Sequence, residues 1–182
     1  MLVYIILGIV ILLVLYAISA YNGFVTLRNR VRNAWSQIDV QLKNRADLIP
    51  NIVETVKGYA SHEKETLDQI VKARSSVLSA NTPQESMDAN NTLSQALNRL
   101  MVVVEAYPEL KANTNFLNLQ QNLRDIEDKI RYSRQFYNDT VLKYNNRIET
   151  FPNNIFASIF GFRQEAFFQA DEGDREVPRV QF

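Results

Sequence analysis

Apolar and polar positions divide the chain into an unbroken apolar segment near its start and a longer remainder with helical periodicity. Residues 2–20 contain no charged side chain, and the first charged side chain is that of Arg28. A helix of this length spans about 28 Å, which matches the hydrocarbon core of a bilayer. Helices of soluble domains keep a polar face, and this segment has none. The segment therefore predicts a membrane-spanning helix.

A cleaved signal peptide is the main alternative interpretation of residues 2–20. No basic region precedes the apolar run, and the run is longer than the usual apolar core of a signal peptide. A cut after Ala20 would follow Ile18 and Ser19, a poor match to the small-x-small pattern of cleavage sites. We therefore expect residues 1–21 to form an uncleaved anchor.

Basic residues follow the apolar segment, whereas none precedes it. Arg28, Arg30 and Arg32 lie on its C-terminal side. The positive-inside rule then predicts a single-pass inner-membrane protein with its N-terminus outside and residues 21–182 in the cytoplasm. If the rule does not hold, the domain is extracytoplasmic. These juxtamembrane arginines are also candidates for contacts with anionic lipid head groups.

Beyond the anchor, apolar residues recur every three or four positions, which is typical of helices with one buried face. The first helix continues from the anchor, and we interpret Pro50 as a kink within it because no convincing N-cap precedes the proline. Gly58 predicts its end. Ser61 is placed to cap the second helix.

The start of the third helix is the clearest boundary in the chain. Thr82 is the expected N-cap, Pro83 occupies the first helical position, and Glu85 completes a capping box. We expect this helix to run up to Pro108, which ends it. No part of residues 24–151 has the alternating pattern of a strand.

The fourth helix carries the longest apolar stripe, with the three-and-four spacing of a coiled-coil-like bundle. It is expected to start at Asn113 or Thr114 and to stop at Pro152. Short connections between four helices favour antiparallel packing. We thus predict an all-α fold in which a transmembrane helix precedes an up-and-down four-helix bundle with a long first and last helix.

This interpretation divides the chain into three parts. Residues 1–21 form the transmembrane anchor, and residues 22–151 form the helical bundle. Residues 152–182 form an aromatic C-terminal segment that ends in an acidic tail from Asp171 to Phe182.

Composition excludes several classes of function. The 20 basic and 20 acidic residues give zero net charge, which argues against a general nucleic-acid binder. The chain has no cysteine, so disulfides, cysteine–zinc sites and thiol catalysis are excluded. Its single histidine, His62, cannot form the two-histidine site of a metallopeptidase. We expect no catalytic residues, no bound metal and no cofactor.

Three carboxylates of the first helix are the basis of an alternative function. Asp39, Asp47 and Glu54 lie on roughly one face, and Arg99 or Arg124 could stand opposite them. A carboxylate-based metalloprotein or enzyme would use such a group. We favour surface ion pairs, each stabilising the fold by well under ~1 kcal/mol.

Two tyrosine–asparagine pairs repeat one heptad apart in the fourth helix, namely Tyr137–Asn138 and Tyr144–Asn145. Asparagine is a poor helix former, so two of them within a helix indicate a hydrogen-bonding task. We favour a role in fixing the register of the bundle. The alternative is a ridge on which a partner docks, and all four residues are candidate interaction residues.

Seven of the ten phenylalanines lie at or after Phe151. The candidate interaction residues among them are Phe156, Phe160, Phe162, Phe167 and Phe168. Three destinations are open for this apolar segment, namely the outside of the bundle, the membrane interface and another protein. We favour packing on the bundle itself, since Arg163 is the only basic residue near the segment.

Five blocks of the sequence resemble the bacterial LemA family. They are RNRVRNAWSQIDVQL (28–42), DLIPNIVETVKGYASHEKETL (47–67), AYPELKAN (106–113), RQFYNDTVLKYNNRIETFP (134–152) and IFGF (159–162). The resemblance implies a short N-terminal segment, one membrane span and an antiparallel helical bundle. It also implies association with a membrane-embedded metalloprotease, and no enzymatic activity of its own is established for the family.

We therefore expect a membrane-anchored, non-enzymatic interaction or scaffold protein. Its expected partners are the lipid bilayer through residues 2–20, further copies of the chain and a membrane metalloprotease, with no nucleic acid. Two alternatives stay open: the carboxylate-based metalloprotein or enzyme, and a membrane-remodelling protein whose C-terminal phenylalanines insert into lipid.

Overall fold

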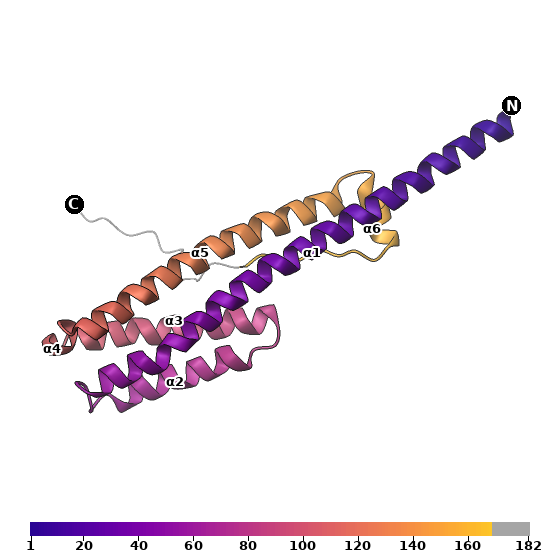
Figure 1. The fold of residues 1–182 in the computed structure, drawn as a ribbon. Helices are drawn as coiled ribbons and strands as arrows, with labels where there is room; N and C mark the ends of the chain where they lie inside the picture. The colour runs from indigo at the N-terminus through magenta and orange to yellow at the C-terminus, as the bar shows by residue number, and fades with distance from the viewer. Residues whose placement is uncertain (169–182) are drawn as a thin grey trace, which may run out of the picture. The chain divides into compact units, whose positions relative to one another are not determined.

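The regular elements of the chain are helices throughout the described part, residues 1–168 of the computed structural model (Figure 1). They are α1 (Leu2–Lys57), α2 (Lys64–Ser79), α3 (Pro83–Val104), α4 (Pro108–Lys111), α5 (Thr114–Glu149) and α6 (Asn153–Ile159). The predicted all-α fold with a long N-terminal apolar helix is confirmed. The predicted acidic tail lies outside the described residues.

The boundaries of the first two helices follow the sequence only in part. α1 passes through Pro50 and ends at Lys57, directly before Gly58, as predicted. The predicted Ser61 cap is wrong, because α2 begins at Lys64 with Glu63 in the N-cap position and no side-chain cap. Backbone hydrogen bonds fill the connection instead, including one from the Glu63 amide to the Ala60 carbonyl (3.1 Å).

The capping box at the start of α3 is confirmed. The Thr82 hydroxyl accepts a hydrogen bond from the Glu85 amide (3.2 Å), and the Glu85 carboxylate accepts one from the Thr82 amide (3.3 Å). At its other end α3 stops at Val104, earlier than predicted. Pro108 instead starts the short helix α4, which suits a residue whose missing N–H is tolerated at a first helical position.

The predicted start of α5 is confirmed. The Asn113 side chain accepts a hydrogen bond from the Phe116 amide (3.0 Å), so Asn113 caps the helix. α5 ends at Glu149, shortly before Pro152.

Residues 1–168 form two compact units, and each draws on α1 and α5. The terminal unit contains residues 1–36 and 135–168, and the central unit contains residues 37–134. Both boundaries fall inside long helices. The division into anchor, bundle and C-terminal segment at residues 21 and 151 stays a prediction.

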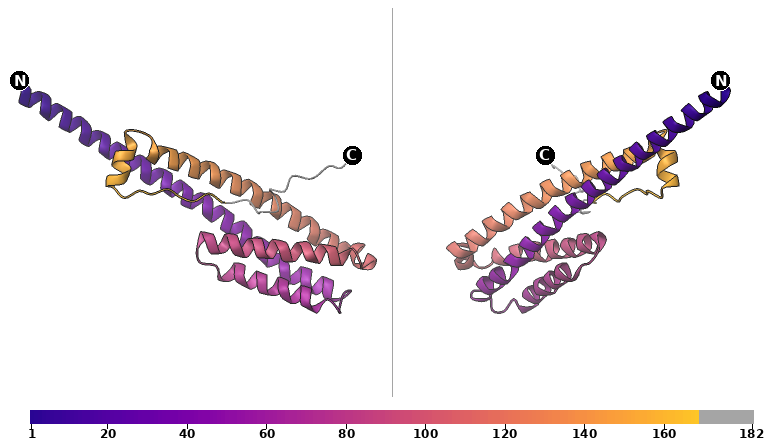
Figure 2. Two further views of the ribbon diagram at one scale, coloured as in Figure 1. Left: turned by 180° about the vertical axis from the view of Figure 1, so that it is seen from behind. Right: turned by 45° about the vertical axis from the view of Figure 1, so that its right-hand side comes forward.

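The central unit is built around the hairpin of α2 and α3, which lie side by side (Figure 2). Arg99 of α3 donates a hydrogen bond to Gln69 of α2 (3.0 Å). Arg74 of α2 donates one to the Ala46 carbonyl of α1 (2.9 Å). Arg45 connects α1 with α3 and α5, as described below. Segments of four helices are thus in contact, while the up-and-down bundle of the whole chain stays a prediction.

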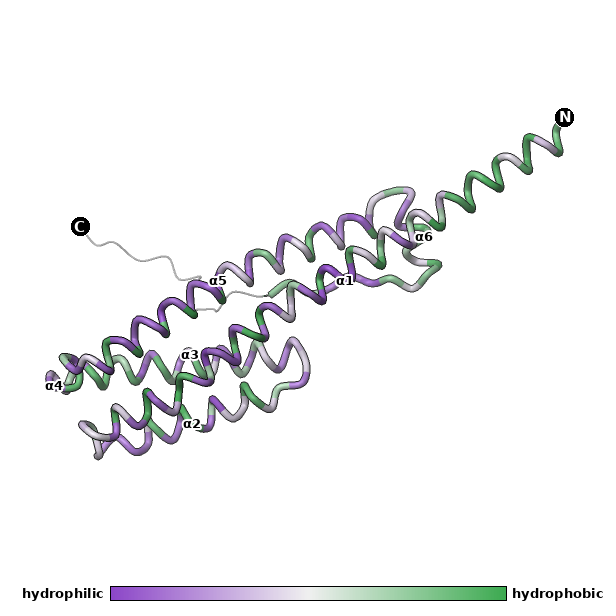
Figure 3. The backbone as a smooth tube through the Cα atoms, viewed as in Figure 1, coloured by the Kyte–Doolittle hydropathy of each residue, from purple (hydrophilic) through white to green (hydrophobic). Residues whose placement is uncertain are grey.

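The terminal unit contains the apolar run. The first third of α1 is hydrophobic on all sides, whereas polar and apolar residues alternate along α5 (Figure 3). The side chains of residues 1–16 are exposed. Within residues 1–168, α1 is the one helix whose length and hydropathy suit a membrane crossing.

Candidate functional site

The two Tyr–Asn pairs of α5 contact the end of the described chain. Residues seven positions apart lie on the same side of a helix, so both pairs present their side chains to one neighbour. That neighbour is the stretch of residues 162–168, which follows α6 and has no regular secondary structure. From here on, the name C-terminal segment refers to residues 162–168 only. Residues 135–149 of α5, all of α6 and this segment belong to the terminal unit.

Each asparagine binds both backbone groups of one residue in the C-terminal segment. Asn145 donates its amide hydrogen to the Glu165 carbonyl (3.0 Å) and accepts from the Glu165 N–H (3.0 Å). Asn138 makes the same two bonds with Phe168, at 3.0 and 2.8 Å. The carboxamides therefore take the place that a neighbouring strand would have in a sheet.

Each tyrosine adds a hydrogen bond to the same segment. The Tyr144 hydroxyl donates to the Arg163 carbonyl (2.9 Å), and the Tyr137 hydroxyl donates to the Ala166 carbonyl (3.0 Å). Burial raises the pKa of both phenols, and the nearby Glu165 carboxylate raises the pKa of each further. Both hydroxyls are thus protonated at neutral pH and act as donors.

The spacing of the pairs matches the spacing of an extended chain. Seven helical residues rise by about 10.5 Å. Three extended residues cover about 10 Å. The two asparagines accordingly bind residues 165 and 168, and the two tyrosines bind residues 163 and 166. A heptad repeat on α5 thus holds every third residue of the C-terminal segment.

Aromatic side chains at both ends of the C-terminal segment pack on α1. The Phe162 ring lies edge-on to Phe24, with centroids 5.2 Å apart. The Phe168 ring stacks on Trp35 at 6.2 Å. Both phenylalanines are buried. The segment is therefore held by hydrogen bonds to α5 and by ring contacts to α1.

The two aromatic residues of α6 and its C-cap pack on α1 nearer its start. Phe156 lies 5.4 Å from the Tyr16 ring, and Phe160 lies 5.2 Å from the Tyr21 ring. The Tyr16 hydroxyl also donates a hydrogen bond to the Asn153 side chain (2.9 Å).

Eight of the nine candidate interaction residues therefore contact another part of their own chain. Phe167 is the exception among the contacts described, and 44% of its surface is exposed. The asparagine pattern indicated hydrogen bonding, and the structure identifies the recipient. Binding of a partner by these residues stays a prediction.

The three juxtamembrane arginines have different surroundings. The Arg28 guanidinium lies 5.0 Å from the centre of the Phe162 ring, a cation–π contact. Arg30 lines a groove of about 170 Å³ with Lys143 of α5. Arg32 is exposed. Their contact with lipid head groups stays a prediction.

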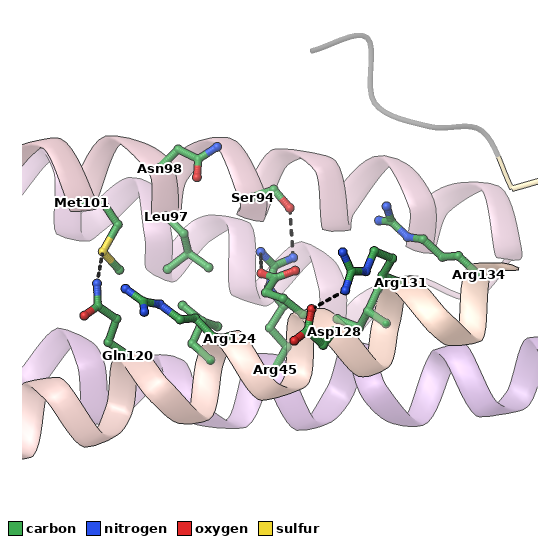
Figure 4. Close-up of a pocket in the computed structure, with 13 residues that line it drawn as sticks. Arg45, Ser94, Leu97, Asn98, Met101, Gln120, Arg124, Asp128, Arg131 and Arg134 are labelled. Atoms are coloured by element: carbon green, nitrogen blue, oxygen red, sulfur yellow. Dashed lines mark hydrogen bonds and ion pairs between the residues drawn. The ribbon is translucent and has the colours of Figure 1, made fainter. Parts of the chain in front are cut away.

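The central unit has a groove of about 560 Å³ whose most buried polar side chain is that of Arg45 (Figure 4). Arg45 is only 2% exposed and was not singled out from the sequence. It donates hydrogen bonds to Asn90 (2.6 Å) and Ser94 (3.0 Å) of α3 and forms an ion pair with Glu127 of α5. The arginine therefore connects three helices, and the partners described here belong to its own chain.

The carboxylates weighed as an alternative site lie on the surface of α1. Asp39 and Glu54 form ion pairs with lysines of the same helix, at 2.7 and 3.9 Å. Asp47 is exposed, as is His62. Within residues 1–168, no three His, Asp or Glu side chains gather in a group that could hold a metal ion.

Comparison with known protein families shows to which family the chain belongs. The family model described as the LemA family matches residues 34–182, which is most of the sequence. The chain belongs to the LemA family. The matched region of this LemA-family chain includes the Tyr–Asn pairs and the C-terminal segment that they hold.

This LemA-family chain is also similar to individual proteins. Protein LemA of Metamycoplasma hominis is 28% identical over 155 residues, which are 85% of this chain and 71% of the relative. Magnetosome protein MamQ 2 of Paramagnetospirillum magneticum is 25% identical over 175 residues, 82% of this chain. The chain spans 64% of that relative's length, less than two thirds. Magnetosome protein MamQ of Magnetospirillum gryphiswaldense is 25% identical over 184 residues, 86% of this chain and 68% of the relative.

Proposed function

We propose that the chain is a single-pass membrane protein that binds other proteins at the membrane surface and catalyses no reaction itself. The continuity of α1 carries this proposal, because the helix begins in the apolar run and ends in the central unit. The side chains of residues 2–16 are exposed, and burying them in lipid is favourable because apolar surface leaves water.

A binding role is supported by how the polar side chains are used. The Tyr–Asn pairs and Arg45 direct their hydrogen bonds at the chain's own backbone and side chains. Such bonds hold helices and segments in place, and they leave the outer helix faces for contacts with other proteins. The names of the three relatives denote no enzyme.

Deleting residues 2–20 is expected to move the protein from carbonate-washed membranes into the soluble fraction, with about a tenfold drop in the pelleted share. An unrelated leucine–alanine run of the same length is the matched control and should keep the protein in the pellet. A deletion variant that stays in the pellet contradicts the span. Protease added to spheroplasts reports the side, and we expect both units to be protected in the cytoplasm of an inner membrane.

Self-assembly is the second part of the proposal. Anchored copies share one plane, which raises their effective concentration. Phe167 is an exposed aromatic side chain, and such residues are enriched where proteins meet. We propose that copies of the chain meet there, and that a membrane metalloprotease, as the family resemblance implies, is a further partner.

Replacing Phe167 by serine is expected to lower the crosslinked dimer fraction in intact membranes about threefold, because an exposed aromatic anchor is lost. Tyr132→Ser is the matched control, since Tyr132 is 64% exposed on α5 and should leave the fraction unchanged. Unchanged crosslinking in Phe167→Ser places the interface elsewhere. Mass spectrometry of the crosslinked products identifies other partners.

A further inference from the structure

The turn that contains α6 exposes an unusual amount of apolar surface. Residues 151–162 contain no charged side chain. Phe151 is 76% exposed, Ile155 is 50% exposed and Ile159 is 69% exposed. Ile155 and Ile159 are four apart and lie on one side of α6, and Phe151 lies in the turn directly before the helix. These three exposed residues are called the apolar stripe below. Exposed apolar stripes of this kind mark a surface that is covered by something other than water.

Contacts with α1 place this stripe beside the end of the apolar run. The Tyr16 hydroxyl binds Asn153 at 2.9 Å, and the Tyr16 ring packs on Phe156. The Tyr21 ring packs on Phe160. Ala20 of α1 is 2% exposed. α6 is therefore fixed along the helix surface between residues 16 and 21.

This position corresponds to the edge of a bilayer if residues 2–20 span it. The apolar run of α1 is about 28 Å long, close to the thickness of a hydrocarbon core, so it has little freedom to slide along the membrane normal. Residues 16 to 21 of α1 then lie within about 8 Å of the hydrocarbon boundary. Tyrosines are enriched at this depth, and α1 has them at Tyr16 and Tyr21.

The exposed side of α6 is itself divided into an apolar and a polar strip. Ile155 and Ile159 form the apolar strip, while Asn154 and Ser158, also four apart and exposed, form the polar strip. A short helix with such adjacent strips suits the plane where lipid tails meet head groups.

A glycine turn ends this apolar stretch. Gly161 has a φ of 72°, a backbone conformation that favours glycine. The Phe162 amide donates to the Ala157 carbonyl (2.9 Å), which completes a Schellman motif. Phe162 is buried under the Arg28 guanidinium. Exposed apolar side chains up to Ile159 are thus followed within three residues by the buried Phe162 ring, which lies under the cationic Arg28 side chain. Apolar side chains followed by a cationic one is the order expected from the acyl region outward through the lipid head groups.

We propose that residues 151–160 lie in the lipid–water interface of the leaflet that α1 leaves, as a second membrane contact. Phe151, Ile155 and Ile159 enter the acyl region, while Asn154 and Ser158 face the head groups. This inference rests on the proposed span of residues 2–20. Its consequence is that the terminal unit is held to the membrane at two points and has a fixed orientation on it.

Site-specific quenching tests the proposal on the full-length chain, which has no native cysteine to interfere. Single-cysteine variants Ile155→Cys and Ile159→Cys carry a fluorescent label, with Ser158→Cys as the matched control on α6 and Leu12→Cys as the reference in the span. Each is reconstituted in phosphatidylcholine vesicles with about one quarter phosphatidylglycerol. Quenchers are lipids with a nitroxide near the head group or near the chain end, and iodide in the water.

Head-group-proximal nitroxides are expected to quench Ile155→Cys and Ile159→Cys with a lipid-to-iodide ratio about threefold above that of Ser158→Cys. Leu12→Cys should respond to the chain-end nitroxide. If Leu12→Cys responds and the two α6 positions match Ser158→Cys, the interfacial contact is wrong while the span stands. If neither lipid probe quenches the label at Leu12→Cys, both the membrane span of residues 2–20 and the interfacial contact of α6 are wrong. Shielding of Ile159→Cys from lipid and iodide alike indicates burial against a second copy and overturns the proposal.

Discussion

Replacing Asn138 and Asn145 together by alanine is expected to release the C-terminal segment from α5. The double variant removes four hydrogen bonds and leaves the N–H and C=O groups of Glu165 and Phe168 without their partners. Unmade hydrogen bonds of buried groups cost about 1–3 kcal/mol each, and release to water recovers part of this, so we expect a loss of about 3 kcal/mol in unfolding free energy. Hydrogen exchange of the amides of residues 165 and 168 is the direct measurement, and it should accelerate about a hundredfold.

Asn146→Ala is the matched control for this experiment. Asn146 is the same residue type on the same helix, but it is exposed, and its side chain is not among those that bind the C-terminal segment. We expect its unfolding free energy to change by less than about 0.5 kcal/mol and its exchange at residues 165 and 168 to stay slow. Slow exchange in the double variant would instead mean that the ring contacts of Phe162 and Phe168 suffice to hold the segment.

The second large loss of unfolding free energy is expected when Arg45, the buried arginine of the central unit, is replaced by alanine. Arg45→Ala leaves Asn90 and Ser94 without their donor and opens a void where the side chain joined three helices. Removing one partner of a buried ion pair typically destabilises a protein by about 3–5 kcal/mol. Because Glu127 is 42% exposed and regains water, we expect about 3 kcal/mol, measured by urea unfolding followed by circular dichroism.

Two further variants separate charge from volume at this site. Arg45→Met fills the space with apolar atoms and should recover more than half of the loss, since apolar replacements of buried ions are often tolerated. Arg124→Ala, at an exposed arginine lining the same groove, should change stability by less than about 0.5 kcal/mol. An Arg45→Ala variant as stable as Arg124→Ala would show that the buried network is not needed for the fold.

Helix boundaries were predictable where local chemistry decides them. Thr82 and Glu85 form their capping box from residues only three apart, so the sequence contains all of its partners. The prediction of Ser61 as the N-cap of α2 is wrong because the backbone, and not a side chain, decides where this helix starts. Backbone hydrogen bonds of the preceding turn extend to Glu63, and α2 begins only after that residue. The sequence pattern predicts Pro108 only as a helix stop, although a proline that ends one helix also suits the first position of the next.

The residues of the Tyr–Asn site could be predicted from the sequence, but the segment that they bind could not. A heptad repeat of Tyr–Asn pairs is visible in sequence, but an extended segment held by side chains has no hydropathy period to identify it. The sequence pattern does not identify Arg45 as a buried residue, because Arg45 lies beside the apolar positions of α1 and its partners Asn90 and Ser94 are more than forty positions away. The two unit boundaries fall inside α1 and α5, where the helical pattern continues without interruption.

The six hydrogen bonds that the two Tyr–Asn pairs make to the C-terminal segment all end on main-chain atoms. One further bond from this segment to α5, donated by the Gln164 side chain to the Glu149 carboxylate, joins two side chains. Side-chain identity at residues 163, 165 and 166 is therefore only weakly constrained by the contact with the Tyr–Asn pairs, whereas the number of residues between the bonded positions is strictly constrained. Inserting or removing a single amino acid between 165 and 168 would put the two asparagine sites out of phase. Evolution of this stretch is thus expected to tolerate substitutions far better than changes in length.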